Sequence, residues 1–305
     1  MSDFLLSDKQ FIINYLHKND IFLKKKYGQN FVVDRMLLET VIGSSDLTSD
    51  DTVLEIGAGV GSLTERILAE GARVIAIEID ERFVSLLTTH FIHNQNFSLI
   101  HGDILKKDTI EKIREAILPN YQSFKVVANV PYYITSPIIT TLLTCGLNIS
   151  DMVFTVQKEV AQRLVAYPNC KEYSAISIFM RYYGDTNLLE SFPPTSFFPS
   201  PRVWSSVIHF SAYTKRPFTA KNPLFFHHCV KLCFTERRKM IKNSISRLIK
   251  GWKIEPDMQL IEKMLAGLNV DPMMRPDQIP VEKFIDISDE LWKIHPDTMK
   301  KKWLA

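Results

Sequence analysis

Short hydrophobic runs alternate with amphipathic helical runs from residue 52 onward. Apolar and β-branched residues predict strands at 52–56, 73–79, 97–103, 125–130 and 151–156. Between them, apolar residues recur at three- and four-residue spacing, as in 63–71 and 81–91, which predicts helices. This alternation is typical of an α/β domain with a doubly wound, mainly parallel sheet.

The alternation changes after Ser174. Residues 174–192 read as a helix followed by a strand, and residues 205–213 read as a further strand after a proline-rich turn. A strand that follows a strand without a helix between them predicts an antiparallel edge.

Helical spacing alone continues from residue 222 onward, and it predicts helices at 223–249, 257–268 and 280–294. The polar, basic segment 212–222 separates these helices from the preceding strand. We therefore expect two domains, an α/β domain at 1–213 and a smaller all-helical domain at 214–305.

The composition is that of an ordinary globular protein, with 46% hydrophobic and 23% charged residues in a chain of 305. No apolar run is long enough for a transmembrane helix, so no membrane partner is expected. The first twenty residues carry acids and lack a long apolar core, unlike a secretory signal. We expect a cytoplasmic protein, with a monomer as the default.

The net charge of +3 is unevenly distributed along the chain. Residues 214–305 hold 18 Lys and Arg against 11 Asp and Glu, a net +7, whereas residues 1–213 carry −4. A basic C-terminal part suggests a polyanionic partner, although a solvated cationic surface would look the same.

The cysteines do not predict a metal site. Cys229 and Cys233 lie four residues apart beside His227 and His228, but no second Cys/His pair at ligand spacing follows. We expect ordinary helix packing there, no bound metal, and no disulfides in a reducing compartment.

Three glycines, Gly57, Gly59 and Gly61, follow the first strand of the α/β pattern and precede a helix. Glycine permits a sharp turn and a close approach by a ligand. The third glycine comes one residue too early for a dinucleotide fingerprint, and no P-loop lysine follows. The loop therefore suits a ligand without phosphates.

Two acids stand at the ends of the next two strands. Glu78 can accept hydrogen bonds from both hydroxyls of a ribose, and Asp103 can accept one from an exocyclic amine such as that of adenine. A ribose, an adenine and no phosphate describe S-adenosyl-L-methionine. Each acid alone could be an ordinary strand-end residue, but together with the glycine loop they favour this cofactor.

The segment Asn129-Val130-Pro131-Tyr132 ends the fourth strand, at the edge of the sheet where ligands bind. The Asn129 amide oxygen and the Val130 carbonyl can each accept one N–H of an adenine amine, which orients its lone pair. Pro131 would hold the backbone, and Tyr132 would stack on the base. A plain strand-to-helix turn is the alternative interpretation.

Several segments resemble one known family, the ribosomal RNA adenine N6,N6-dimethyltransferases of the kasugamycin-sensitivity type. They span nearly the whole chain: KKKYGQNFVVD (24–34), VLEIGAGVGSLT, NVPYYITSP, VQKEVAQRL (156–164), FFPSPRVWSSV (197–207), FTERRKMIKNS (234–244) and LAGLNVDPMMRPDQIPVEKF (265–284). The sequence departs from the family pattern at Val32, Ala58 and Val130, which use mainly backbone or packing contacts, and at Trp204, where the family often has Asp.

The resemblance implies roles for further residues. The N-terminal segment would close over the donor, Ile79 and Ile104 would flank its adenine, and Phe197, with Phe198 as the adjacent candidate, would cover the second face of the target base. The implied donor-binding set is Gln29, Asn30, Val32, Gly57, Gly59, Glu78, Ile79, Asp103, Ile104 and Asn129.

The resemblance also implies the target: two adjacent adenines in a hairpin loop near the 3′ end of small-subunit (16S) rRNA, modified in the immature 30S particle. Basic residues between 231 and 253 have the clustering of phosphate contacts, with Arg237, Arg238, Lys239 and Lys242 as the candidates. Lys24–Lys26 form a second candidate patch.

Three other interpretations remain open at this point. The target could be large-subunit rRNA, as in the enzymes of erythromycin resistance, although the helical segment argues against it. It could be DNA, although no large target-recognition insertion is present. Alternatively, binding to the immature small subunit during ribosome assembly could matter more than catalysis.

Overall fold

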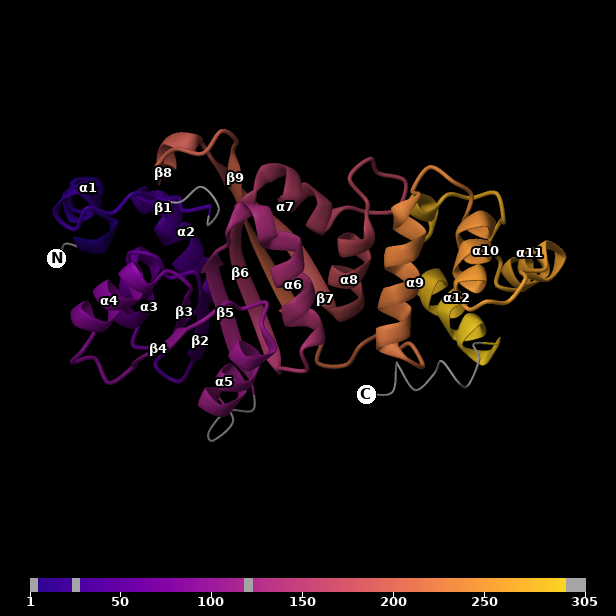
Figure 1. Cartoon of the computed structure of the whole chain (residues 1–305), viewed down its shortest axis with the longest axis horizontal. Coiled ribbons are helices and arrows are strands. Elements are labelled where there is room, and N and C mark those ends of the chain that lie inside the picture. The colour runs from indigo at the N-terminus through magenta and orange to yellow at the C-terminus, as the bar shows by residue number, and fades with distance from the viewer. Residues whose placement is uncertain (1–4, 24–27, 118–122, 295–305) are drawn as a thin grey trace. The chain divides into compact units, whose positions relative to one another are not determined.

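The computed structural model of the chain describes residues 5–23, 28–117 and 123–294 (Figure 1). It divides into two compact units. The first unit comprises Met1–Ala161 with Thr186–Ala212, and the second comprises Gln162–Asp185 with Tyr213–Ala305. The second unit thus takes in residues 162–185 in addition to the predicted C-terminal helical segment.

A seven-stranded sheet forms the centre of the described part of the first unit, in the order β4-β3-β2-β5-β6-β9-β7. Its strands are β2 (Thr52–Ile56), β3 (Arg73–Glu78), β4 (Phe97–His101), β5 (Phe124–Asn129), β6 (Ile149–Gln157), β7 (Gly184–Phe192) and β9 (Ser205–Ala212). Neighbours from β4 to β6 are parallel, and β9 runs antiparallel to β6. The predicted α/β sheet with an antiparallel edge is confirmed.

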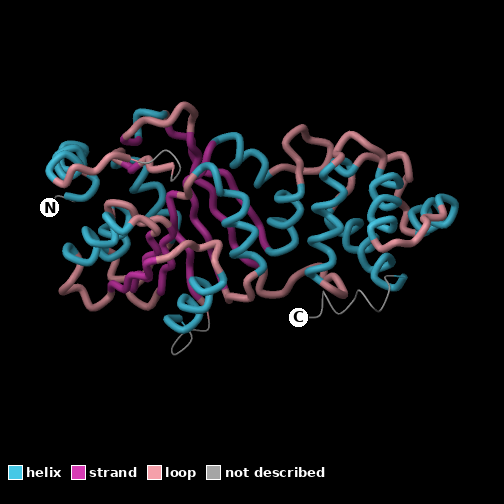
Figure 2. Tube along the Cα trace, viewed as in Figure 1, coloured by secondary structure: helices cyan, strands magenta, loops and turns pink. Residues whose placement is uncertain are grey.

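Helices flank this sheet (Figure 2). They are α2 (Arg35–Ser45), α3 (Ser62–Ala69), α4 (Glu81–His90), α5 (Lys107–Ile117), α6 (Thr135–Thr144) and α7 (Lys158–Val165). The carboxylates of Asp34 and Asp80 accept hydrogen bonds from backbone N–H groups in the first turns of α2 and α4, which caps both helices. Strand β2 is fully buried, as expected for a central parallel strand.

The strand register brings the predicted site segments to one edge of the sheet. Ile56 is level with Ile77, Glu78 with His101, and Asn129 with Thr155. Because these strands are parallel, the loops that follow them all emerge at the carboxyl edge, where ligands of doubly wound sheets bind.

The N-terminal segment is anchored to the start of α3. Leu6, in the short helix η1 (Leu5–Ser7) that precedes α1 (Lys9–Lys18), has no exposed surface. Its N–H donates to the Glu65 carboxylate at 3.1 Å, and its carbonyl accepts from the Ser62 hydroxyl at 2.6 Å. Gly61, whose φ is +91°, lies so close that a Cβ there would be 2.9 Å from a Leu6 methyl group.

A two-stranded ladder joins this segment to a distant part of the chain. Strand β1 (Phe31–Val32) pairs antiparallel with β8 (Phe197–Phe198), so that Val32 faces Phe197. The ladder also fixes residues 28–30, because they lead directly into β1.

The described helices of the second unit are α8 (Ala175–Tyr183), α9 (Pro223–Thr235), α10 (Ile241–Gly251), α11 (Met258–Gly267) and α12 (Val281–Ile294), besides the last residues of α7. The prediction of one continuous helix over 223–249 is wrong, because residues 236–240 form a turn between α9 and α10. The N–H of Ile241 donates to the Met274 carbonyl at 2.7 Å, so a tertiary contact fixes where α10 begins.

The cluster of His227, Cys229 and Cys233 lies on the buried side of α9. Burial raises the pKa of the Cys233 thiol to about 12. Among the helices of the described residues, none combines the length and the apolar content that crossing a membrane requires.

Replacing Leu6 with alanine should destabilise the fold. Leu6 is fully buried, so Leu6→Ala should lower the free energy of unfolding by about 2–5 kcal/mol. Urea-induced unfolding followed by circular dichroism measures this change. Leu5, which is 46% exposed, provides the matched control. Leu5→Ala should change stability by less than about 0.5 kcal/mol, and equal effects of the two substitutions would contradict the anchoring role.

Candidate active site

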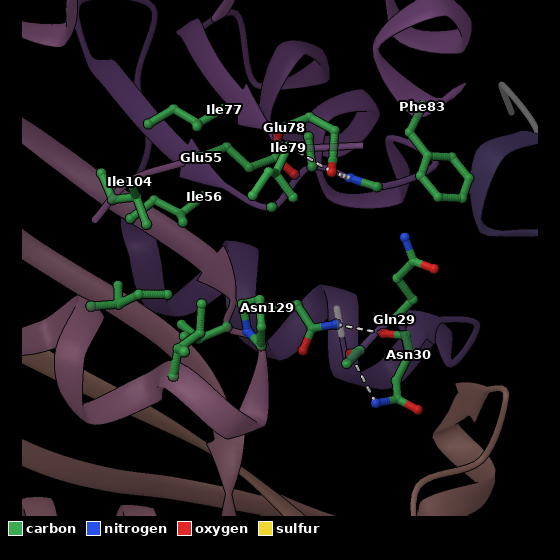
Figure 3. Close-up of a pocket in the computed structure, with 18 of the residues that line it drawn as sticks. Gln29, Asn30, Glu55, Ile56, Ile77, Glu78, Ile79, Phe83, Ile104 and Asn129 are labelled. Carbon is green, nitrogen blue, oxygen red and sulfur yellow. Dashed lines mark hydrogen bonds between the residues drawn. The ribbon is translucent and has the colours of Figure 1, made fainter. Parts of the chain in front are cut away.

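A cavity of about 220 Å³ opens at the carboxyl edge of the sheet. Its walls come from the N-terminal segment 28–32, the glycine loop, the ends of β3 and β5, and the loop after β4. Figure 3 shows Glu78 and Ile79 on one side of the cavity and Asn129 and Asn30 on the other. Nearly all of the predicted donor-binding and catalytic residues line this one space.

The glycine loop is held against Glu78. Gly57 and Gly59 have φ angles of +73° and +56°, which side chains rarely adopt. The N–H of Gly59 donates to the Glu78 carboxylate at 2.7 Å (Figure 3). A Cβ on Gly59 would also lie 3.0 Å from the ring of Phe31, so both the backbone angle and the space favour glycine at this position.

Glu78 is a buried carboxylate with three backbone donors. Its second oxygen accepts from the N–H groups of Ile79 and Asp80, each at 2.8 Å. Burial raises the pKa of Glu78, and the three N–H donors oppose that rise. A carboxylate has about four acceptor positions. Three are occupied, so about one acceptor position of Glu78 remains for a ligand. The sequence suggested that Glu78 could accept from both hydroxyls of a ribose.

Asp103, Ile79 and Ile104 also line the cavity. One Asp103 carboxylate oxygen accepts from the Leu105 N–H at 2.9 Å, which orients the side chain within its own loop. Ile79 is partly exposed and Ile104 is buried. The resemblance implies that Ile79 and Ile104 flank the adenine of the donor, and both side chains line the cavity together with Asp103.

Gln29 is tied to the start of α4. Its side-chain N–H donates to Asp80 at 2.9 Å, and Asp80 also accepts from the guanidinium of Arg82. Hydrogen bonds from Arg82 lower the pKa of Asp80 to about 2, so this carboxylate stays charged. Asp80 was not predicted as a site residue. Its position before α4 could be recognised as a helix cap from the sequence, but its partner Gln29 is far away in the chain.

Asn129 presents a buried, unpaired acceptor. Its amide N–H donates to the Asn30 carbonyl at 2.8 Å (Figure 3). A carbonyl can only accept, so the amide nitrogen must face it and the orientation of the side chain is fixed. The Asn129 Oδ1 is buried and has no hydrogen-bond partner within the described residues. Such an atom is costly unless a ligand supplies a donor.

The residues that follow Asn129 are held in place. The Val130 N–H donates to the Thr155 carbonyl at 3.1 Å, and the Pro131 carbonyl accepts from Ile134. The Tyr132 hydroxyl is hydrogen-bonded to the Ser205 hydroxyl. Burial raises the pKa of Tyr132 to about 12, so the phenol stays neutral, and the hydrogen bond to Ser205 holds its ring.

Phe197 does not join this group. It is 1% exposed, lies in the hydrophobic core, and is not among the residues that line the cavity. Its neighbour Phe198 is partly exposed and has the Lys9 ammonium 5.8 Å from its ring centroid. In this structure, Phe197 would need to move before it could cover a base, so its predicted stacking role does not fit its burial.

Glu55 also lines the cavity, and it was not among the residues predicted from the sequence. It is the one charged residue in the buried strand β2, and an acid in such a strand is a signal that the sequence alone shows. The Thr64 hydroxyl donates to it at 2.6 Å. Burial raises the pKa of Glu55 to about 8, so this carboxyl is largely protonated at neutral pH.

The residues of the cavity wall bear on the charge of the ligand that would bind there. Among the described residues that line it, Glu55, Glu78 and Asp103 are acidic and no Lys, Arg or His is present. Cations that would pair with a phosphate are therefore lacking in the described wall, although Ser62 and Leu63 at the start of α3 do line it. This wall instead favours a neutral or positively charged ligand.

The four residues predicted to bind RNA fall into two groups. Arg237 is ion-paired with Asp277 at 3.0 Å and also donates to the Cys170 carbonyl, while Lys242 is ion-paired with Glu262 at 2.7 Å. Arg238 and Lys239 are exposed and make no ion pair with any described residue. The patch Lys24–Lys26 lies outside the described residues.

The sequence matches the family model described as ribosomal RNA adenine dimethylase over residues 22–293. It is 36% identical over 277 residues to a protein named ribosomal RNA small subunit methyltransferase A from Halothermothrix orenii, covering 91% of each chain. A protein of the same name from Clostridium perfringens is 36% identical over 278 residues, covering 91% of this chain and 94% of that protein.

Two solved structures share the fold. A dimethyladenosine transferase from Plasmodium falciparum superposes with a TM-score of 0.69 at 24% identity, covering 86% of this chain and 98% of that chain. The 23S rRNA methyltransferase ErmE superposes with a TM-score of 0.61 at 22% identity, covering 86% of this chain and 99% of that chain.

Glu55 should make stability depend on pH. The folded chain holds this proton more tightly than the unfolded chain, whose carboxyl has the ordinary value of 4.5. The stabilisation is complete below about 4.5 and is lost as pH rises through about 8. Glu55→Gln keeps an acceptor for Thr64 but does not titrate. The free energy of unfolding of the wild type, relative to this variant, should therefore fall across that range, and parallel pH profiles would contradict the assignment.

Proposed function

Because the chain belongs to the ribosomal RNA adenine dimethylase family, we propose that it transfers methyl groups to N6 of adenine in small-subunit rRNA. Family membership and the fold support a methyltransferase in general terms. The names of the relatives support the small subunit as the target. The finer part of the proposal is dimethylation of two adjacent adenines in a hairpin loop near the 3′ end of the rRNA, within the immature 30S particle.

The proposed cofactor is S-adenosyl-L-methionine, which supplies an electrophilic methyl group on a positively charged sulfur when bound. The acidic wall without cations supports a ligand of this charge. Gly57 and Gly59 would lie along its methionine end, Glu78 would accept from the ribose, and Asp103 would accept from the adenine amine between Ile79 and Ile104. Gln29, Asn30 and Val32 would cover it from the N-terminal segment.

The observation that carries the proposal is the unpaired Oδ1 of Asn129. An adenine N6–H would supply the missing donor. The Val130 carbonyl would accept the second N–H, and the two acceptors together would orient the nitrogen lone pair. Since the Asn30 carbonyl already holds the amide nitrogen, the acceptor is preorganised rather than free to rotate.

Tyr132 would stack on the target base rather than act as a proton acceptor. Its raised pKa keeps the phenol protonated, and its hydrogen bond to Ser205 fixes the ring. A base can meet such a ring only when it is unstacked from its neighbours, as in a hairpin loop or after flipping. The amine needs no carboxylate base, because the methylated product loses its extra proton readily.

Asn129→Ala should lower methyl transfer by about a hundredfold or more, because the amine loses its orienting acceptor. Binding of the methyl donor, followed by calorimetry, should fall much less. The substrate is small subunits from cells that lack the enzyme, and the readout is N6,N6-dimethyladenosine by mass spectrometry.

The exposed Asn14 provides the matched control for this experiment. Asn14→Ala should leave methyl transfer at the wild-type level. Wild-type activity in Asn129→Ala would refute the mechanism, and absence of the modified base in wild-type cells would refute the function itself.

Arg238 and Lys239 should contact RNA phosphates, since no described acid neutralises them. The double variant Arg238→Gln/Lys239→Gln should weaken binding to small subunits and reduce the slope of log affinity against log salt by about one to two. Filter binding across a salt series measures both quantities. Lys242→Gln is the control, because Lys242 is already paired with Glu262, and its salt slope should match the wild type. Equal slopes in the double variant and the wild type would contradict the assignment.

A further inference from the structure

An exposed tryptophan lies at the carboxyl edge of the sheet, outside the residues that line the cavity. Trp204 is 50% exposed and immediately precedes β9. The adjacent Val203 is 43% exposed. Burying a side chain of this size is favourable, so its exposure at the edge that holds the active site calls for a binding partner.

The topology places Trp204 near the target pocket. Strand β9 is antiparallel to β6, so it starts at the edge where β5 and β6 end. Asn129 on β5 is level with Thr155 on β6, which is level with Val207 on β9. Trp204 precedes Val207 by three residues, so it lies two strands away from Asn129 and three residues further toward the carboxyl edge. With strands about 4.8 Å apart and a rise of about 3.3 Å per residue, the two backbones are roughly 15 Å apart.

Tyr132 bridges this distance. Its hydroxyl is hydrogen-bonded to Ser205, the residue next to Trp204. The Trp204 carbonyl accepts from the Lys158 N–H at 2.9 Å, which ties it to the end of β6. Trp204 is therefore held by the same strand ends that hold the proposed stacking tyrosine.

Cations accompany this aromatic side chain. The Lys158 ammonium lies over the Trp204 ring, 5.7 Å from its centroid, within the range of a cation–π contact. Lys158 and Arg202 are both exposed, and neither is ion-paired with a described residue. An aromatic face with one cation over it, and a second exposed cation two residues earlier in the chain, suits a nucleobase and its phosphates better than an apolar protein surface.

We propose that Trp204, with Lys158 and Arg202, binds a nucleotide that flanks the target adenosine, its base stacked on the indole and its phosphate near the two cations. This inference rests on the proposed function for the identity of the target, and it adds a second point of contact on the same RNA strand. Trp204 would act in binding and positioning rather than in the transfer step.

The test uses the full chain and a fluorescein-labelled RNA nonamer, UUUUAUUUU, with binding followed by anisotropy. Trp204→Ala should weaken binding roughly tenfold, as expected for one lost base–aromatic stack. Trp204→Phe should weaken it less, because a ring remains. Val203→Ala removes an exposed neighbour without an aromatic face, and it should bind like the wild type.

Abasic nonamers identify the contact. An abasic residue on one side of the adenosine should weaken wild-type binding about as much as Trp204→Ala does, with no further loss when the two changes are combined. Unchanged binding in Trp204→Ala, as expected if the patch serves a protein partner, would overturn the proposal. The proposal would also be overturned if an abasic residue on either side of the adenosine weakened binding equally in the wild type and in Trp204→Ala.

Methyl incorporation into small subunits distinguishes failure of this proposal from failure of the proposed function. Trp204→Ala should raise the KM for small subunits and leave kcat near the wild-type value. If the wild type transfers no methyl group, the proposed function fails, and the nonamer experiment still decides whether Trp204 binds RNA.

Discussion

The carboxylate of Glu78 is buried at the end of β3 and must be hydrogen-bonded, and the site is arranged around this requirement. Its donors are the backbone N–H groups of Gly59, Ile79 and Asp80. The first draws the glycine loop against the strand end, and the other two shape the turn into α4. Asp80 then caps α4 and accepts from Gln29, which brings the N-terminal segment to the same place. The hydrogen bonds of Glu78 thus link the glycine loop to the turn into α4, and Asp80 extends this network to the N-terminal segment.

The strands, the glycine loop and the strand-end acids could be predicted from the sequence, because each is encoded within a few consecutive residues. Short continuous apolar runs and the spacing of glycines are local signals. The parallel register then follows from the rule that loops after parallel strands share an edge. For this reason the sequence alone was enough to assign Glu78, Asp103 and Asn129 to one site.

What could not be predicted depends on contacts between remote segments. The burial of Phe197 follows from the pairing of β8 with β1, far away in the chain. The turn at residues 236–240 has helical periodicity on both sides, and only the bond between Ile241 and Met274 reveals the break. Arg237 and Lys242 look like free cations in the sequence, because nothing local shows that Asp277 and Glu262 face them.

The antiparallel course of β9 has a consequence for how such a site can diverge. The side-chain acceptor that would orient the reacting amine belongs to Asn129, at the end of β5. The neighbouring residue Trp204 instead precedes β9, which runs antiparallel to β6. A substitution at position 204 changes this part of the edge without altering the backbone on which Asn129 is mounted. If the proposed roles hold, chemistry and RNA preference would lie on separable pieces of one edge, and a change at position 204 could alter the RNA context while leaving the reaction unchanged.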